Sequence, residues 1–168
     1  MATETKHCIF IIDDEPIQNE MLKDYLSERF LYDIVAFDNG EEALKNIDQQ
    51  HPDIIILDYH LSANKAGAKN GVDILKSIKE SHPEIDVIMF SGQDKIEVAI
   101  DSMKYGAYDY VVKGETAFSR MENVINKVSE LRRVKVINKA YRRTIVFLSV
   151  AIAIVIIIAI CLPFIFDK

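Results

Sequence analysis

The apolar residues in the first two thirds of the chain fall into short runs that alternate with segments of helical spacing. Short apolar runs bounded by turn or polar residues predict buried strands, and they lie at 7–13, 32–37, 54–57, 86–90 and 109–112. The intervening segments predict amphipathic helices at 17–29, 41–50, 71–81, 95–105 and from about residue 115 onward. A β-α order repeated five times predicts an α/β fold with a five-stranded, parallel, doubly wound sheet.

The last part of the chain is a long uncharged segment. From Thr144 to Phe166 there are 23 consecutive residues without a charge, and most are Ile, Val, Leu, Phe or Ala. As a helix at about 1.5 Å per residue, this segment is roughly 35 Å long, enough to cross a hydrocarbon core of about 30 Å. A buried core helix would be shorter, and a signal peptide would stand at the N-terminus. The segment is therefore predicted to be a transmembrane helix.

Charge divides the chain in a similar way. Residues 1–126 carry 24 Asp and Glu against 12 Lys and Arg, whereas residues 127–143 carry seven basic residues and only one acid, Glu130. We therefore expect a domain at 6–133, a basic juxtamembrane segment at 134–143 and then the span. Because basic residues favour the cytoplasmic side, the domain is expected in the cytoplasm, with a single pass through the cell inner membrane. The acidic domain lacks the basic face of a nucleic-acid binder.

Composition argues against two common kinds of site. Six glycines, at 40, 67, 71, 92, 106 and 114, are too scattered to form a phosphate-binding glycine loop. Cys8 and Cys161 are far apart and form no CxxC motif, which argues against a disulfide framework or a zinc site.

Polar side chains stand where four of the predicted strands end. Asp13 and Asp14 follow the first strand, Asp58 the third, Ser91 the fourth and Lys113 the fifth. Because the carboxyl ends of parallel strands meet at the ligand-binding edge of such sheets, these groups are expected to lie together. Three neighbouring carboxylates favour a divalent cation such as Mg²⁺, which takes carboxylate, water and phosphate oxygens as ligands. One carboxylate could then attack phosphorus to form an aspartyl phosphate, whose charge the cation and the lysine would neutralise.

This arrangement resembles the receiver domain of bacterial two-component response regulators, over about residues 6–131. The resemblance implies a flavodoxin-like receiver fold in which Asp58 is the phosphoacceptor. It also implies that Asp14 and Asp58 bind Mg²⁺ directly and Asp13 through water, with the main-chain carbonyl of His60 as a further ligand.

The same resemblance assigns roles to three more residues. Ser91 matches the hydroxyl position that moves toward the phosphoryl group, and Lys113 matches the family's invariant lysine. Tyr110, three residues before that lysine, matches the aromatic switch that turns inward on phosphorylation.

The sequence departs from the family pattern in two places. Gly114 follows the lysine, where the family usually has a proline. The loop at 60–70 lacks the usual proline, and the matching glycine, Gly71, comes late enough after Asp58 to imply an insertion of about five residues. The insertion could alter partner choice or dephosphorylation, or it could be a tolerated surface loop.

Together these features predict a membrane-tethered, single-domain response regulator. It would accept a phosphoryl group on Asp58 from a sensor histidine kinase or a phosphotransfer protein, with Mg²⁺ as cofactor. Its own chemistry would be at most self-phosphorylation from phosphodonors and autodephosphorylation, and its output would go to a protein partner. No helix-breaking residue lies between Ser119 and Thr144, so the last helix is expected to run straight into the span, where a dimer is possible.

Two alternatives stand beside this prediction. A membrane-anchored interaction module with a degenerate receiver fold would bind its partner without phosphate. Mg²⁺-dependent labelling by a small phosphodonor separates that module from a working receiver. A haloacid-dehalogenase-type phosphatase needs a second Asp two residues after its nucleophile, but this chain has His60 after Asp58 and Glu15 after Asp13.

Overall fold

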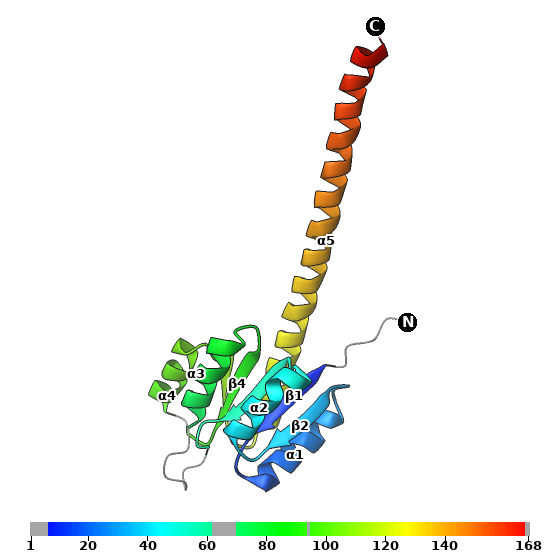
Figure 1. Ribbon diagram of the computed structural model, residues 1–168. Helices are drawn as coiled ribbons and strands as arrows, with labels where there is room; N and C mark the ends of the chain where they lie inside the picture. The colour runs from blue at the N-terminus through cyan, green and yellow to red at the C-terminus, as the bar shows by residue number, and fades with distance from the viewer. Residues whose placement is uncertain (1–6, 62–69, 94, 167–168) are drawn as a thin grey trace. The chain divides into compact units, whose positions relative to one another are not determined.

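A computed structural model describes residues 7–61, 70–93 and 95–166 of the 168-residue chain. The strands are β1 (Cys8–Ile12), β2 (Asp33–Phe37), β3 (Ile54–Asp58), β4 (Asp86–Ser91) and β5 (Asp109–Val112). The helices are α1 (Pro16–Ser27), α2 (Gly40–Gln50), α3 (Gly71–Ser81), α4 (Ile96–Lys104) and α5 (Ala117–Phe166). Strands and helices alternate along the chain in the predicted order (Figure 1).

The five strands form one sheet in the order β2-β1-β3-β4-β5. Every neighbouring pair is parallel, which confirms the predicted five-stranded parallel sheet. The chain order reverses direction at β1, so β1 and β3 lie side by side in the middle of the sheet. Ligands bind beside such a reversal, at the carboxyl ends of the strands.

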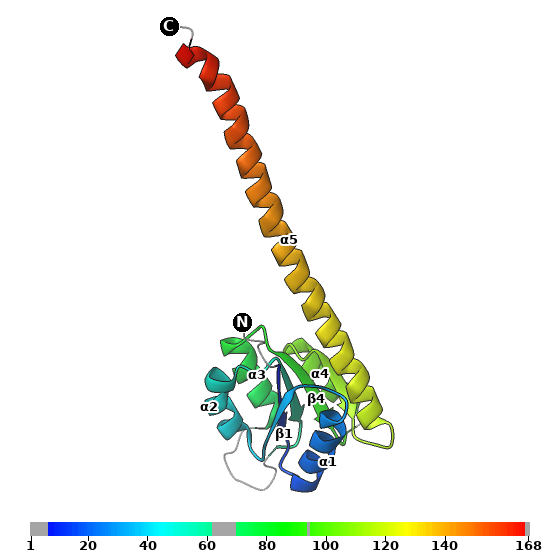
Figure 2. The ribbon, with the colours of Figure 1, turned by 90° about the vertical axis from the view of Figure 1, so that its right-hand side faces the viewer.

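Helices cover both faces of the sheet, because alternate strand residues point to opposite sides. On one face, Phe10 and Ile12 pack into a core with residues of α2 and α3, such as Ile47 and Leu75. The intervening residues of β1 are also fully buried, and α1 and the first turns of α5 lie on that second face (Figure 2). Burial on both faces explains why the sequences of central strands such as β1 and β3 are apolar almost throughout.

Local signals set the helix ends close to where the sequence predicts them. Pro16 occupies the first position of α1, where its missing N–H costs nothing. The side chain of Asn39 accepts a hydrogen bond from the main-chain N–H of Glu42 at 2.9 Å and starts α2. The same helix ends at His51, whose backbone is left-handed with φ 46°, just before Pro52.

Gly71 is required by a close approach between α3 and the end of β3. A Cβ at this position would lie 2.1 Å from the carbonyl oxygen of Asp58 and 2.8 Å from the Cα of Tyr59. The main-chain N–H of Gly71 also donates to the carbonyl of Tyr59 at 3.1 Å. The glycine thus holds the start of α3 against the backbone that carries Asp58. Most of the predicted loop insertion, residues 62–69, lies outside the described residues.

Replacing Gly71 by Ala is expected to destabilise the domain by about 1–3 kcal/mol, because the added methyl group meets backbone atoms that cannot rotate away. Urea unfolding measures the loss. Gly114→Ala is the matched control, since a Cβ there meets no described atom within 4 Å and the expected change is within about 0.5 kcal/mol. Equal stability of Gly71→Ala and the parent chain would contradict the close approach.

The chain divides into two compact units, residues 1–125 and 126–168. One helix, α5, runs from Ala117 to Phe166. Between Ser119 and Thr144 it is unbroken, as predicted from the lack of helix-breaking residues in that stretch. Over the described residues, no helix is both long and apolar enough to cross a membrane. The predicted transmembrane helix over 144–166 is therefore not confirmed. The side chains at 151, 153 and 155–166 lie outside the described residues.

Candidate functional site

The strands bring four of the predicted site residues to one edge of the sheet. Asp13 follows β1, Asp58 ends β3, Ser91 ends β4 and Lys113 follows β5. The parallel register pairs Asp58 with Phe90 and Ser91 with Val112, so neighbouring strands end at nearly the same level. The sheet itself therefore places these side chains close together.

Asp58 is a buried carboxylate at the centre of this edge, with 3% of its surface exposed. Its Oδ2 accepts a hydrogen bond from the main-chain N–H of His60 at 3.1 Å. Its Oδ1 lies 3.2 Å from the ammonium nitrogen of Lys113, but among the described residues it has no hydrogen-bond donor of good geometry. One oxygen is thus fixed by the backbone, while the other faces the lysine and remains available to a further ligand.

Lys113 joins the two buried carboxylates. Its Nζ donates to Oδ2 of Asp13 at 2.7 Å and forms the ion pair with Asp58. Asp13 is itself 2% exposed, and its Oδ1 accepts from the main-chain N–H of Glu15 at 2.9 Å. The ammonium therefore lies between two carboxylates that carry more negative charge than it can balance.

The surroundings of Asp58 and Lys113 raise the pKa of both groups, for different reasons. Burial raises the pKa of the Asp58 carboxyl, the nearby charge of Lys113 opposes that rise, and the charge of Asp13 adds to it. Burial alone would lower the pKa of Lys113, but the hydrogen bond to Asp13 and the charges of both carboxylates outweigh it, and the pKa is raised. The raised pKa keeps Lys113 in its charged form. The raised pKa of Asp58 means that its ionised form is disfavoured in the folded protein.

Asp14 brings a third carboxylate to the same place. Oxygen atoms of Asp13, Asp14 and Asp58 all lie within 4.8 Å of one another. Asp14 is the most exposed of the three, and the buried Oδ1 of Asp58 lacks a hydrogen-bond donor among the described residues. Three carboxylates beside one ammonium provide the oxygen ligands and the excess negative charge that Mg²⁺ requires. The residues present fit this ion, and Asp13, Asp14 and Asp58 are the carboxylates that could hold it.

Ser91 and Tyr110 are linked through one loop residue, Gln93. The hydroxyl oxygen of the fully buried Ser91 accepts from the main-chain N–H of Gln93 at 3.1 Å. Tyr110 is 7% exposed, and its hydroxyl donates to the carbonyl oxygen of Gln93 at 2.8 Å. The ring of Tyr110 therefore points inward in this structure, and both side chains hold the loop after β4.

Two site residues escaped the sequence analysis. Gln93 acts through its main chain, so its residue type carries no signal. Asn19 is buried on α1, and its Nδ2 donates to the carbonyl oxygen of Asp13 at 2.7 Å. A polar residue on the otherwise apolar side of a predicted helix was the signal that could have identified it.

Among the described residues, His60 and Gly114 lie at the two departures from the family pattern. His60 lies beside Asp58, where its main-chain N–H is engaged as described, and its ring meets that of Tyr59 edge-on at 4.9 Å. Its carbonyl oxygen as a metal ligand remains a prediction. At Gly114 no described peptide bond is cis, and the backbone does not adopt a positive φ. The main-chain N–H of Lys113 donates to the carbonyl of Ser91 at 2.7 Å, which aligns the lysine without the usual proline.

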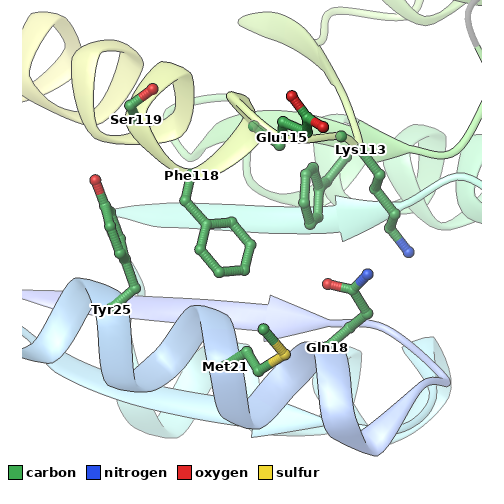
Figure 3. Close-up of a pocket in the computed structure, with 10 residues that line it drawn as sticks. Gln18, Met21, Tyr25, Lys113, Glu115, Phe118 and Ser119 are labelled. Carbon is green, nitrogen blue, oxygen red and sulfur yellow. The ribbon is translucent and has the colours of Figure 1, made fainter.

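A cavity of about 540 Å³ opens beside the site, between α1 and the first turn of α5. Phe118 reaches from α5 toward α1, between Met21 and Tyr25, and Lys113 and Gln18 stand at one end (Figure 3). This opening gives a molecule from outside a route to the lysine end of the site.

Comparison with known proteins agrees with this geometry. The family model described as the response regulator receiver domain matches residues 9–126. The chain therefore belongs to the response regulator receiver family.

Individual relatives support the same assignment. The protein-glutamate methylesterase/protein-glutamine glutaminase of Bacillus subtilis (strain 168) is 32% identical over 114 residues, which cover 66% of this chain and 30% of the relative. The transcriptional regulatory protein MalR of the same organism is 27% identical over 135 residues, 80% of this chain and 54% of MalR. The chain thus spans about half or less of these curated relatives. The crystal structure of the receiver domain of NtrX from Brucella abortus is 30% identical with a TM-score of 0.64, and the match covers 73% of this chain and 98% of that one.

These findings define what the first part of the chain is. It is a response regulator receiver domain, the phosphoacceptor component of two-component signalling. Receiver domains take phosphoryl groups from histidine kinases or phosphotransfer proteins and typically bind Mg²⁺ at an acidic site.

Proposed function

We propose that this protein is a membrane-tethered response regulator whose Asp58 accepts a phosphoryl group from a phosphohistidine of a sensor kinase or phosphotransfer protein. The observation that carries the proposal is the lysine bridge: Nζ of Lys113 lies 2.7 Å from Asp13 and 3.2 Å from Asp58, with Asp14 completing the acidic group. This arrangement supplies a nucleophile, a fixed cation and a magnesium site in one place.

The transfer uses the carboxylate of Asp58 as nucleophile. One of its oxygens forms the new bond to phosphorus, the P–N bond to the donor histidine breaks, and the imidazole leaves as a neutral ring after taking up a proton. Asp14, Asp58 and the carbonyl of His60 would hold Mg²⁺ directly and Asp13 through water, and the ion would supply charge that neutralises phosphoryl oxygens. The ammonium of Lys113 stays beside Asp58 and balances the charge of the product.

Ser91 and Tyr110 are proposed to respond to the phosphoryl group on Asp58. The Oγ of Ser91 accepts from Gln93, so its own hydroxyl hydrogen can donate to a phosphoryl oxygen. A movement of Ser91 would shift the Gln93 main chain, to which the Tyr110 hydroxyl is also bonded. Tyr110, whose ring already points inward here, would then transmit the change through this hydrogen bond.

The direct test of this proposal is labelling of the purified full chain with acetyl phosphate, with and without Mg²⁺, read by intact mass. A gain of one phosphoryl group that depends on Mg²⁺ supports a working receiver. A folded chain that gains no mass would instead support the phosphate-independent interaction module.

The tether and the location are proposed from the sequence. The 23 uncharged residues over 144–166 and the basic residues before them favour a single pass through the cell inner membrane, with the receiver domain in the cytoplasm. The output is proposed to go to a protein partner, with no nucleic acid involved. Pairing of two copies through α5 belongs to the same proposal.

Removal of residues 144–168 is expected to move the protein from the membrane fraction to the soluble fraction, because the apolar anchor is lost. Fractionation after alkaline extraction measures it. A full-length control with Ile156→Arg and Ile157→Arg is expected to bind membranes more weakly, since each charge near the middle of a span costs about 3 kcal/mol. A truncated chain that still sediments with membranes would contradict the anchor.

A further inference from the structure

The second unit of the chain, residues 126–168, carries a heptad pattern on α5 before the long uncharged segment. With Leu131 at position a, Val134 falls at d, Asn138 at the next a and Tyr141 at the next d. All seven charged residues between 130 and 143 fall on other positions of the repeat. From Thr144 to Phe166 no residue is charged, so the four positions from 131 to 141 define the pattern.

These positions are exposed along the helix. Leu131, Val134 and Tyr141 are 48–68% exposed, and the next two positions in the series, Ile145 and Leu148, are 51% and 64% exposed. An apolar stripe of this length, with the charges at the other positions of the repeat, is typical of a helix that pairs with another helix.

The polar residue within the stripe points to a second copy as the partner. A single Asn at position a favours a parallel two-stranded coiled coil, because the two amides meet across the seam and satisfy each other. In an antiparallel pair, position a faces position d, and Asn138 would meet Val134 or Tyr141 without an amide partner. Self-pairing in parallel is therefore the arrangement that this sequence satisfies.

The charges beside the stripe agree with the parallel arrangement. Glu130 occupies position g and Lys135 occupies position e of the following heptad. In a parallel pair these two positions come together across the interface, so Glu130 of each copy meets Lys135 of its partner. The pairing gives two attractive contacts, one on each side of the seam.

We propose that the face formed by Leu131, Val134, Asn138 and Tyr141 binds the same face of a second copy in a parallel, in-register coiled coil. This names the surface for the proposed pairing of two copies. It depends on neither the phosphorylation of Asp58 nor the membrane tether, so its failure is distinguishable from theirs.

Single cysteines test the interface in the full chain purified in detergent. The background carries Cys161→Ala, and the other cysteine, Cys8, is buried in the core. Leu131→Cys and Asn138→Cys place a thiol at the seam, whereas Arg133→Cys places one at position c on the opposite side. Mild oxidation followed by non-reducing electrophoresis measures the covalent dimer, and a phosphodonor is not needed.

We expect both seam variants to cross-link at least about tenfold faster than Arg133→Cys, because only the seam brings identical residues together. Cross-linking at 138 but not at 131 would indicate an antiparallel crossing and overturn the proposal. Equal rates at all three sites would indicate random collision and also overturn it. A chain that stays monomeric in sedimentation equilibrium at micromolar concentration would also overturn it.

Discussion

Asp58→Asn is expected to abolish phosphoryl labelling while the protein remains folded. The amide cannot attack phosphorus, so the Mg²⁺-dependent mass gain from acetyl phosphate falls to background. The amide oxygen still accepts the hydrogen bond that the main-chain N–H of His60 gives to Asp58 at 3.1 Å. Intact mass spectrometry measures the labelling, and circular dichroism verifies the fold.

The same substitution is expected to stabilise the metal-free protein at neutral pH by about 1 kcal/mol. Burial raises the pKa of Asp58, so the ionised carboxylate destabilises the folded state. This destabilisation is absent at pH values below the ordinary pKa of aspartate. It is fully present at pH values above the raised pKa of Asp58. The advantage of Asp58→Asn in urea unfolding should therefore shrink as the pH falls through the raised pKa.

Asp24→Asn is the control for both measurements, because Asp24 is an exposed carboxylate on α1. It is expected to label like the parent chain and to change stability by no more than about 0.5 kcal/mol. Undiminished, Mg²⁺-dependent labelling of Asp58→Asn would assign the phosphoacceptor to another residue.

Lys113→Ala is expected to destabilise the metal-free protein by about 2–4 kcal/mol. The substitution leaves the buried carboxylates of Asp13 and Asp58 without the ammonium that lies 2.7 Å and 3.2 Å from them. Labelling by a small phosphodonor should persist, because the nucleophile and the acidic group remain, but the response of a partner should be lost. Urea unfolding without metal measures the stability.

Magnesium provides the second arm of this experiment. Because Mg²⁺ neutralises the same carboxylates, it should stabilise Lys113→Ala more than the parent chain. Lys104→Ala is the matched control, since it removes an exposed ion pair with Asp101 and should cost less than about 1 kcal/mol. Equal losses of unfolding free energy in Lys113→Ala and Lys104→Ala would contradict the claim that Lys113 balances the buried carboxylates of Asp13 and Asp58.

The fold and the main site were predictable because both follow from simple patterns. Parallel strands buried on both faces must be apolar throughout, so their ends are marked where charged and hydroxyl residues begin. That rule alone places Asp13, Asp58, Ser91 and Lys113 at one edge of the sheet. The same rule says nothing about how these groups pair with one another.

Contacts made by main-chain atoms were not predictable in this way. Gln93 joins Ser91 and Tyr110 through its N–H and its carbonyl, which every non-proline residue possesses. The spacing of Gly71 indicated an insertion, but only the fold shows that a Cβ there would meet the carbonyl of Asp58 at 2.1 Å. Such constraints depend on distances between segments far apart in the sequence.

The predicted transmembrane helix rests on hydropathy alone. Hydropathy sums the apolar character of a segment and contains no information on what surrounds it. The unbroken course of α5 between Ser119 and Thr144 was predictable because the absence of Gly and Pro from that stretch is a local property of the chain.

Identification of the modified residue tests the central claim most directly. The full chain is labelled with acetyl phosphate and Mg²⁺, then reduced with borohydride, which converts an aspartyl phosphate to homoserine, and the peptides are analysed by mass spectrometry. We predict homoserine at position 58 and at no other position. Homoserine at position 13 or 14, or a labelled protein without homoserine, would contradict the assignment of Asp58 as the phosphoacceptor.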